Sequence, residues 1–317
     1  MTAEICRAPS LRQDTAVPRA PSQRQDTAVP RAPSQRQDTA VPRAPSQRQD
    51  TAVPRAPSQR QDTAVPRAPS LRQDTGSPPG TKRPPAGSVT IVPVRDLGEV
   101  RPGDDLAGML CAAATFVDGD VVVVTQKVVS KAEGRLVRID PEDTAARRQL
   151  AESEAVRVLR RRGDLVITET RHGFVCANSG IDLSNVDDGW AALLPEDPDR
   201  SARRLRDAIG ARSGAAVAVI VSDTFGRTWR RGVTDVAIGC AGIAAVVDLR
   251  GTTDALGRTL LATEICVADE LAGAAELVMG KASGIAAAIV RGVERSWLRR
   301  GSVAEEVVRP YGEDLFR

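Results

Sequence analysis

The chain has 317 residues, a formal net charge of +3 and a single histidine, His172. One histidine argues against a histidine-ligated zinc site and against a Ser-His-Asp triad. The longest apolar runs are too short to cross a bilayer, and the N-terminus lacks a signal-peptide core, so no membrane association is expected. Five scattered cysteines without a C-x-x-C pair fit a reducing compartment, and we expect the protein in the cytoplasm.

The first 88 residues differ in composition from the rest of the chain. A twelve-residue unit, RAPS(L/Q)RQDTAVP, occurs five times between Arg7 and Pro66, and a sixth copy that begins at Arg67 breaks down after Thr75. Each unit has two prolines and no apolar residue larger than leucine, so it cannot bury enough surface to offset the entropy of ordering it. We therefore predict a disordered repeat tail over residues 1–88 and a folded domain over residues 89–317.

Charge separates the same two regions. Residues 1–88 contain 14 basic and 7 acidic residues, whereas the remainder contains 30 basic and 34 acidic residues. The basic tail can meet an acidic surface through diffuse charge, but it has no aromatic residue on which nucleic-acid bases could stack. We expect no specific nucleic-acid binding.

Apolar periodicity in the folded part predicts a series of helices and strands. In chain order they are a strand at 89–94, a helix at 106–116, a strand at 121–124, a helix at 141–162, strands at 165–169 and 174–177, a helix at 201–209, strands at 215–221 and 243–249, a helix at 267–279 and a strand at 285–290. The helix at 141–162 is predicted from Asp140 as its cap, acids in its first turn, arginines in its last turn and Gly163 after it. His172 lies between two strands and is interpreted as a turn residue rather than a ligand.

One stretch combines a buried strand with polar chemistry. The apolar run Ala215–Val221 ends at Ser222-Asp223-Thr224, and Gly226 then leads to Arg227, Arg230 and Arg231. Carboxylate and hydroxyl oxygens are ligands for Mg²⁺ or Mn²⁺, and arginines can pair with phosphate oxygens, so the pattern fits a metal and phosphate site. In the alternative interpretation Asp223 or Thr224 caps a helix and the arginines are solvated. The pattern alone leaves both open.

Two other polar segments are candidates for ligand contact. Lys127 and Lys131 follow the strand at 121–124, in a position suited to anionic oxygen. The polar loop 178–186 carries Asp182, which belongs either to an ordinary turn or to a metal site. The segment GKASG is not a Walker A loop, because Ala275 stands where a glycine is required, and no G-x-G-x-x-G follows a strand.

Several stretches together carry a resemblance to a known family. They are VVVVTQKVVSKAEGR, CANSGIDLSNV, VSDTFGRTWRRGVTDVAIG, EICVADELAGAAELVMGKASG and RPYGEDLF. In this order, from about Val89 to Arg317, the chain resembles the coenzyme F420-0:L-glutamate ligase family, and it is similar to the ligase half of the two-domain actinobacterial enzyme. The resemblance implies an α+β fold with mixed and antiparallel sheets and flanking helices, and a homodimer. The repeat tail has no counterpart in the family.

The resemblance also implies an activity and its cofactors. The expected enzyme is a GTP-dependent ligase that joins L-glutamate to the lactyl carboxylate of coenzyme F420-0 and then adds further γ-linked glutamates. It is expected to use Mg²⁺ or Mn²⁺ at two sites, with K⁺ assisting. A carboxylate does not accept an amine directly, because oxide is a poor leaving group. Transfer of the γ-phosphoryl group of GTP would give an acyl phosphate, a step that needs charge neutralisation and alignment. No residue is singled out as a general base.

Site residues are carried over position by position. Asp182 and Asp223 are expected to bind one metal ion, and Thr224 a second. Nucleotide contacts are expected at Leu97, Gly98, Glu99, Val100, Gln126, Lys127, Lys131, Asn185, Met279, Gly280, Lys281, Ala282, Ser283, Gly284 and Ile285. Lys281 stands where the archaeal pattern has an acidic ligand for the second metal, so either that site is altered or Lys281 supplies part of its charge.

Two alternatives remain from the sequence. The same scaffold could ligate a different amino acid or acceptor, which competition between substrates would reveal. The chain could also be a non-catalytic binding module that recruits a partner through its repeats.

Overall fold

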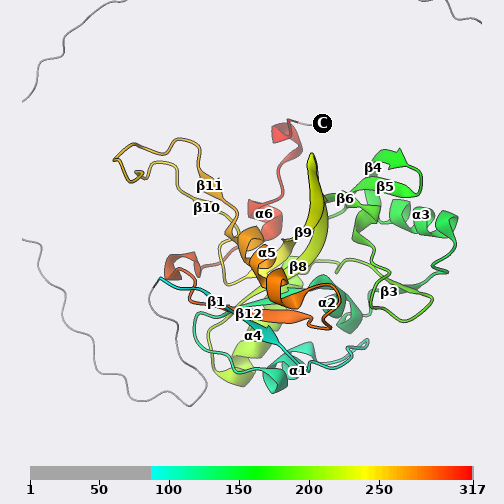
Figure 1. The fold of residues 1–317 in the computed structure, drawn as a ribbon, viewed down its shortest axis with the longest axis horizontal. Coiled ribbons are helices and arrows are strands. Elements are labelled where there is room, and N and C mark those ends of the chain that lie inside the picture. Colours follow the sequence, from blue (N-terminus) through cyan, green and yellow to red (C-terminus); the bar gives the residue numbers. More distant parts are fainter. Residues whose placement is uncertain (1–86, 316–317) are drawn as a thin grey trace, which may run out of the picture. The chain divides into compact units, whose positions relative to one another are not determined.

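The computed structural model describes residues 87–315, so the repeat tail predicted to be disordered lies, up to residue 86, outside the described residues. The main element is a five-stranded mixed sheet (Figure 1). Its strand order is β1 (Thr90–Val94), β12 (Ala287–Arg291), β2 (Val121–Thr125), β8 (Ala218–Arg227) and β9 (Arg230–Ala241). Only β2 and β8 pair in parallel, and the other neighbours are antiparallel.

The centre of this sheet is buried on both faces. Val121–Val124 in β2 and Val219–Val221 in β8 have no exposed surface, as expected for continuous β-branched runs in a central parallel pair. Helix α4 (Pro198–Ser213) contacts β8 and β9, with α1 (Leu106–Ala113) packed against it. Helix α5 (Val267–Met279) contacts β9, β12 and β1. These helices close the core around the strands.

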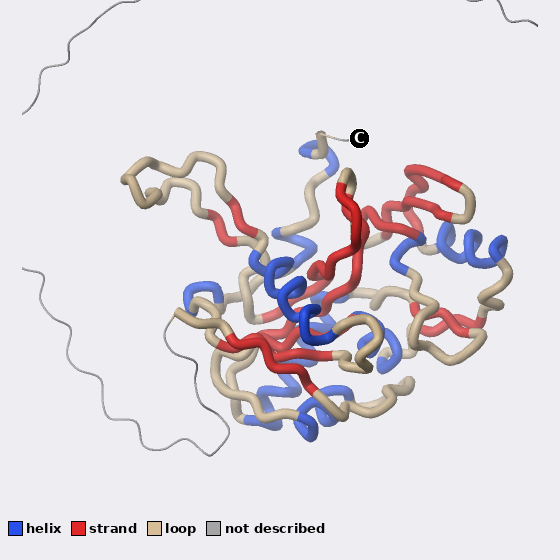
Figure 2. Tube along the Cα trace, viewed as in Figure 1, coloured by secondary structure: helices blue, strands red, loops and turns tan. Residues whose placement is uncertain are grey.

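The segment between α2 (Gln126–Ala132) and α4 forms a smaller region with two short sheets (Figure 2). One sheet pairs β3 (Leu136–Arg138) with β7 (Trp190–Ala192). The other has the order β4 (Ala155–Arg162), β5 (Leu165–Thr170) and β6 (Val175–Ala177), with α3 (Thr144–Ser153) packed on β4 and β5. A short 3-10 turn, η1 (Asn178–Gly180), follows β6 and leads to the loop that carries Asp182.

The predicted helix at 141–162 is wrong in its second half. Helix α3 ends at Ser153, and β4 pairs antiparallel with β5. Arg157, interpreted as part of a charged helix end, lies opposite Glu169 on β5 and forms an ion pair with it at 2.7 Å. The segment contains the β-branched residues Val156 and Val158, and pairing with β5 makes it a strand, with register shifts between Ala155 and Arg157 and between Val158 and Arg160. The helix cap is Asp143, which accepts hydrogen bonds from the amides of Ala145 and Ala146, and not Asp140.

The predicted strand at 243–249 is also mostly wrong. Ile243, Ala244 and Ala245 are fully buried, but they lie in a loop that starts at Gly242 (φ +79°), and only β10 (Val247–Asp248) pairs, with β11 (Glu264–Ile265). The backbone amide of Ala244 donates to the carbonyl of Trp297, and that of Ala245 donates to the Glu306 carboxylate. The C-terminal segment, with η2 (Arg295–Trp297), α6 (Val303–Glu306) and η3 (Tyr311–Glu313), thus supplies the partners that a strand neighbour would have supplied.

Other predicted elements are present with shifted ends. The strand expected at 215–221 starts at Ala218 and continues to Arg227, so Asp223 and Thr224 lie inside a strand and do not cap a helix. The helix expected at 201–209 is longer at both ends, and the helix at 267–279 has the expected bounds. The helix predicted at 106–116 overlaps α1. The predicted strands overlap β1 (89–94), β5 (165–169), β6 (174–177) and β12 (285–290). The α+β fold with mixed sheets and flanking helices is confirmed.

No helix within residues 87–315 combines the length and the apolar character that a bilayer crossing requires.

A buried carboxylate holds three parts of the fold together. Asp199, near the start of α4, is 5% exposed and accepts hydrogen bonds from four donors: the amides of Cys240, Val303 and Ala304 and the hydroxyl of Ser302. These donors belong to β9 and to the start of α6. Its loss would leave several buried amides without an acceptor.

We predict that Asp199→Ala lowers the free energy of unfolding by about 3 kcal/mol or more, since each unpaired buried donor costs about 1–3 kcal/mol. Urea denaturation followed by circular dichroism measures this change. The control is Asp207→Ala on the same helix, where the carboxylate is 66% exposed and pairs with its neighbour Arg206; it should change stability by less than about 0.5 kcal/mol. Equal stabilities of the two variants would contradict the role given to Asp199.

Candidate active site

The strand directions bring distant segments to one edge of the main sheet. Because β2 and β8 are parallel neighbours, their carboxyl ends coincide, with Thr125 paired to Ser222. Strand β12 runs antiparallel between β1 and β2, and its first residue, Ala287, pairs with both Val94 and Val124. The segments that follow β1, β2 and Ser222, and the segment that precedes β12, therefore meet at this edge. Ligands of open α/β sheets commonly bind at the carboxyl ends of parallel strands.

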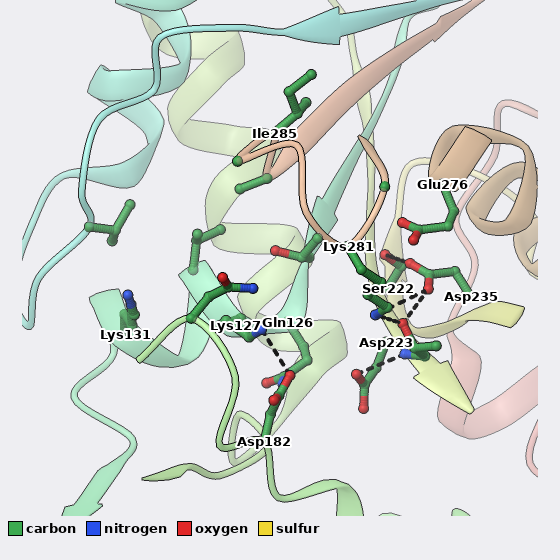
Figure 3. A pocket seen from close by; sticks show the side chains of 18 of the residues that line it. Gln126, Lys127, Lys131, Asp182, Ser222, Asp223, Asp235, Glu276, Lys281 and Ile285 are labelled. Atoms are coloured by element: carbon green, nitrogen blue, oxygen red, sulfur yellow. Dashed lines mark hydrogen bonds and ion pairs between the residues drawn. The ribbon is translucent and has the colours of Figure 1, made fainter. Parts of the chain in front are cut away.

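A pocket of about 220 Å³ opens at this edge; we call it the central pocket (Figure 3). It brings together fourteen of the predicted site residues: Gly98, Glu99, Val100, Gln126, Lys127, Lys131, Asp182, Asn185, Asp223, Thr224, Gly280, Lys281, Gly284 and Ile285. Ala282 and Ser283 do not line it. Leu97 and Met279 are buried in the hydrophobic core instead, where they support the lining segments.

Asp182 reaches the central pocket from the smaller region. Its backbone bridges to Ala192 beside β7, and its carboxylate accepts hydrogen bonds from the amide and hydroxyl of Ser184 at 2.7 and 2.8 Å. The ammonium of Lys127 forms an ion pair with it at 2.9 Å. Burial alone would raise the pKa of Asp182, but the bonds from Ser184 and Lys127 outweigh burial and hold the pKa below its ordinary value. Asp182 is therefore an oriented, ionised carboxylate.

Asp223 has the opposite electrostatic environment. Burial raises its pKa to about 7, the neighbouring carboxylates of Asp182 and Asp235 add to this rise, and the Thr224 amide and Lys281 oppose it. The only hydrogen bond to its side chain among the described residues comes from the Thr224 amide at 2.8 Å. The carboxylate of Asp182, from a separate part of the fold, thus lies close enough to Asp223 to destabilise its charge. A cation between them would remove this cost.

Sequence reasoning missed two acids of the central pocket, Asp235 and Glu276. Asp235 is 3% exposed and lies opposite Thr224 across the β8–β9 hairpin, where it accepts hydrogen bonds from the hydroxyls of Ser222 and Thr224 at 3.0 and 2.5 Å. Glu276 lies on α5 and was interpreted only as a helix acid. A regular hairpin that closes with Arg227 opposite Arg230 would have set Thr224 opposite Val233. The register shift between Gly226 and Arg227 places Asp235 there instead.

Gln126 carries an unsatisfied donor in the central pocket. Its side chain is buried and its Oε1 accepts a hydrogen bond from Ser130, but its Nε2 has no hydrogen-bond partner among the described residues. A buried amide without an acceptor is costly, so this group is poised for an acceptor oxygen supplied by a ligand. Lys131, also buried, pairs with Glu99 on the same side of the pocket.

Three predicted phosphate-binding arginines lie elsewhere. Arg227, Arg230 and Arg231 are exposed at the tip of the β8–β9 hairpin, which extends away from the sheet in Figure 1, and none of them lines the central pocket. His172 is in a turn, as predicted, and its Nε2 contacts the carbonyls of Pro195 and Glu196 at 2.9 and 3.1 Å.

The residues present fit a divalent cation only in combination with a ligand. Carboxylate oxygens are the donors that Mg²⁺ and Mn²⁺ prefer. Within residues 87–315, however, no three Asp, Glu, His or Cys side chains form a ready metal cluster. Asp182 and Asp223 can supply two oxygens, so phosphate oxygens or water would have to complete the shell, as is common for Mg²⁺.

A second cavity adjoins the first. This side pocket, of about 430 Å³, shares Glu99, Val100 and Lys131 with the central pocket. Trp190 lines it, and the guanidinium of Arg138 lies 5.6 Å from the centre of the Trp190 ring. The two cavities together offer space for a ligand longer than a phosphate chain, or for two substrates.

Comparison with known proteins identifies the family. The family model of F420-0:gamma-glutamyl ligase matches residues 96–292. The coenzyme F420:L-glutamate ligase of Methanothermobacter thermautotrophicus is 41% identical over 249 residues, which cover 72% of this chain and 99% of that protein. The enzymes of the same name from Methanopyrus kandleri and Archaeoglobus fulgidus are 42% and 41% identical over 73% and 72% of this chain, and 98% and 96% of their own lengths. The chain therefore belongs to the F420-0:gamma-glutamyl ligase family.

Proposed function

We propose that this protein uses GTP to join L-glutamate to the lactyl carboxylate of coenzyme F420-0, and then adds further γ-linked glutamates. Family membership supports the ligase activity and its two substrates. One observation carries the nucleotide part: the central pocket combines two convergent carboxylates with a buried, unpaired amide and three lysines. Carboxylates that can bind a metal ion and cationic or N–H donors that can meet phosphate oxygens suit a metal–triphosphate complex.

The residues that line the central pocket have distinct roles in this proposal. Asp182 and Asp223 would hold Mg²⁺ or Mn²⁺, which when bound would neutralise charge on the transferring phosphoryl group. Gln126 Nε2 would donate to a phosphate oxygen. Lys131, buried and paired with Glu99, would place a second positive charge beside the nucleotide. The loop before β12 would close over the phosphates through Gly280 and Gly284.

The reaction then follows from leaving-group chemistry. The F420-0 carboxylate attacks the γ-phosphorus of GTP, its new bond to phosphorus forms, and the bond to the β-phosphate oxygen breaks to release GDP. The amine of glutamate attacks the resulting acyl phosphate, phosphate leaves, and one proton is lost from nitrogen. Both steps develop negative charge on phosphoryl oxygens, which Gln126, Lys127 and Lys131 would stabilise in a preorganised pocket.

We also propose a homodimer, with K⁺ as an assisting cation. The long arm between β10 and β11, which projects from the domain in Figure 2, carries Leu256 and Leu261 with 78% and 83% of their surface exposed. Exposed leucines on a projecting segment are typical of an association surface. Light scattering after gel filtration measures the mass, and replacement of K⁺ by Na⁺ in the assay measures the cation's effect.

The first prediction concerns the metal carboxylates. With F420-0, glutamate, GTP and Mn²⁺, the wild-type protein should add one glutamyl mass and release GDP. Asp223→Asn should lower turnover by about 100-fold or more, because it removes charge from the metal site, while the fold is retained. The exposed Asp207→Asn on α4 is the control. Near-normal turnover of Asp223→Asn would exclude Asp223 from the metal site, and a folded wild-type protein that makes neither product would defeat the proposed function.

The second prediction concerns the unpaired amide. Gln126→Met keeps the volume but removes the donor, so it should weaken GDP binding by about 10-fold or more, the usual value of a hydrogen bond to a charged group. Isothermal titration calorimetry measures the affinity. Gln149→Met, at an exposed position on α3, is the matched control and should bind GDP as the wild type does. Unchanged affinity in Gln126→Met would show that this amide does not meet the nucleotide.

The third prediction concerns the tail. Deletion of residues 1–88 should leave kcat and KM unchanged, since all residues assigned to the reaction lie between Leu97 and Ile285. Steady-state kinetics of full-length and shortened proteins provide the comparison. A large loss of activity would show that the repeats act in catalysis.

A further inference from the structure

Lys281 occupies the part of the central pocket where cation ligands gather. It follows Gly280, which ends α5 with φ +58°, and its side chain turns toward the β8–β9 hairpin (Figure 3). The ammonium hydrogen-bonds to the Thr224 hydroxyl and lies 4.0 Å from Oδ1 of Asp235. The Lys281 side chain is 59% exposed whereas that of Asp235 is 2% exposed, so the lysine reaches inward from the surface to a buried acid.

Three carboxylates share the charge of this lysine. Besides Asp235, both Asp223 and Glu276 line the same pocket. Lys281 lowers the pKa of each of these two acids, although burial keeps both above their ordinary values. The ammonium thus lies among acids that would otherwise repel one another.

The Thr224 hydroxyl is already engaged on both sides. It donates a hydrogen bond to Oδ1 of Asp235 and accepts one from the ammonium of Lys281. A divalent ion bound to this hydroxyl would stand within a few ångströms of the ammonium. Two cations at such a short distance repel each other strongly in a partly buried site. The divalent ion and the lysine ammonium therefore compete for one position.

We propose that Lys281 is a built-in cation that replaces a second divalent ion at Thr224, Asp235 and Glu276, so that the enzyme holds one divalent ion per chain, at Asp182 and Asp223. This inference rests on the proposed function, because the single ion is the one that accompanies the nucleotide. In this proposal Thr224 contacts Lys281 instead of a metal ion, and the enzyme uses one divalent ion instead of two. Lys281 is then a positioning residue for the phosphate side of the pocket, with a fixed single charge and no exchangeable ligands.

The experiment counts bound Mn²⁺ on the full-length protein saturated with GDP, by equilibrium dialysis with electron paramagnetic resonance of the free ion. After subtraction of the Mn²⁺ that unbound GDP holds in solution, the wild type should bind one Mn²⁺ per chain. Lys281→Gln removes the positive charge and frees the oxygen atoms of Thr224, Asp235 and Glu276 to bind a metal ion. This variant should therefore bind a second Mn²⁺, with an affinity at least about 10-fold above any second binding event on the wild type. Lys281→Arg keeps the charge and should still bind one.

A double variant and a folding control complete the test. Lys281→Gln with Glu276→Gln should return to one ion, because it removes a ligand of the opened site. Circular dichroism checks that each variant is folded. If a variant does not fold, the number of Mn²⁺ ions bound by the wild type still tests the proposal. Two ions on the wild type, or one ion on folded Lys281→Gln, would overturn the proposal while leaving the proposed function intact. No Mn²⁺ on the wild type with GDP would remove the metal site of the proposed function and this inference with it.

Discussion

The structure depends on one electrostatic constraint, the approach of Asp182 and Asp223 in a partly buried pocket. Burial raises the pKa of Asp223 to about 7, and the neighbouring carboxylate of Asp182 adds to this rise, so a charge on Asp223 is costly. Lys127 on one side and Lys281 on the other each compensate part of it. Two acids and an unpaired Gln126 amide remain in the same pocket, and in the proposed function a cation with a phosphate chain would satisfy both.

The sheet explains how such a costly arrangement is held in place. The parallel pairing of β2 and β8 fixes Gln126 and Asp223 relative to each other, and both strands are anchored by valines with no exposed surface. Asp182 is fixed independently, through its bridge to Ala192 and two bonds from Ser184. Rigid strands and short polar turns thus position the charged groups before any ligand arrives, as preorganised catalytic sites require.

Sequence reasoning reached four of the five strands of the main sheet but not β9, the polar ends of two of these strands and, through the resemblance, most residues of the pocket. The β-branched run at Val121–Val124 and the apolar run before Ser222 were sufficient for β2 and β8. It failed at Val156–Arg162, since an arginine-rich segment fits both a helix end and a strand until a partner strand selects one. It also missed Asp235, because only the hairpin register, with its shift between Gly226 and Arg227, places that acid opposite Thr224. Pairing partners distant in sequence carry information that local patterns lack.

The central claim is that Asp182 and Asp223 share one cation whose remaining ligands include phosphate. Electron–nuclear double resonance on the protein with Mn²⁺ and GDP tests it most directly, because a phosphate oxygen bound to Mn²⁺ produces a strong ³¹P coupling. We expect that coupling in the wild type, and its loss together with most Mn²⁺ binding in both Asp182→Asn and Asp223→Asn. Mn²⁺ bound without ³¹P coupling, or either variant binding Mn²⁺ as the wild type does, would contradict the account.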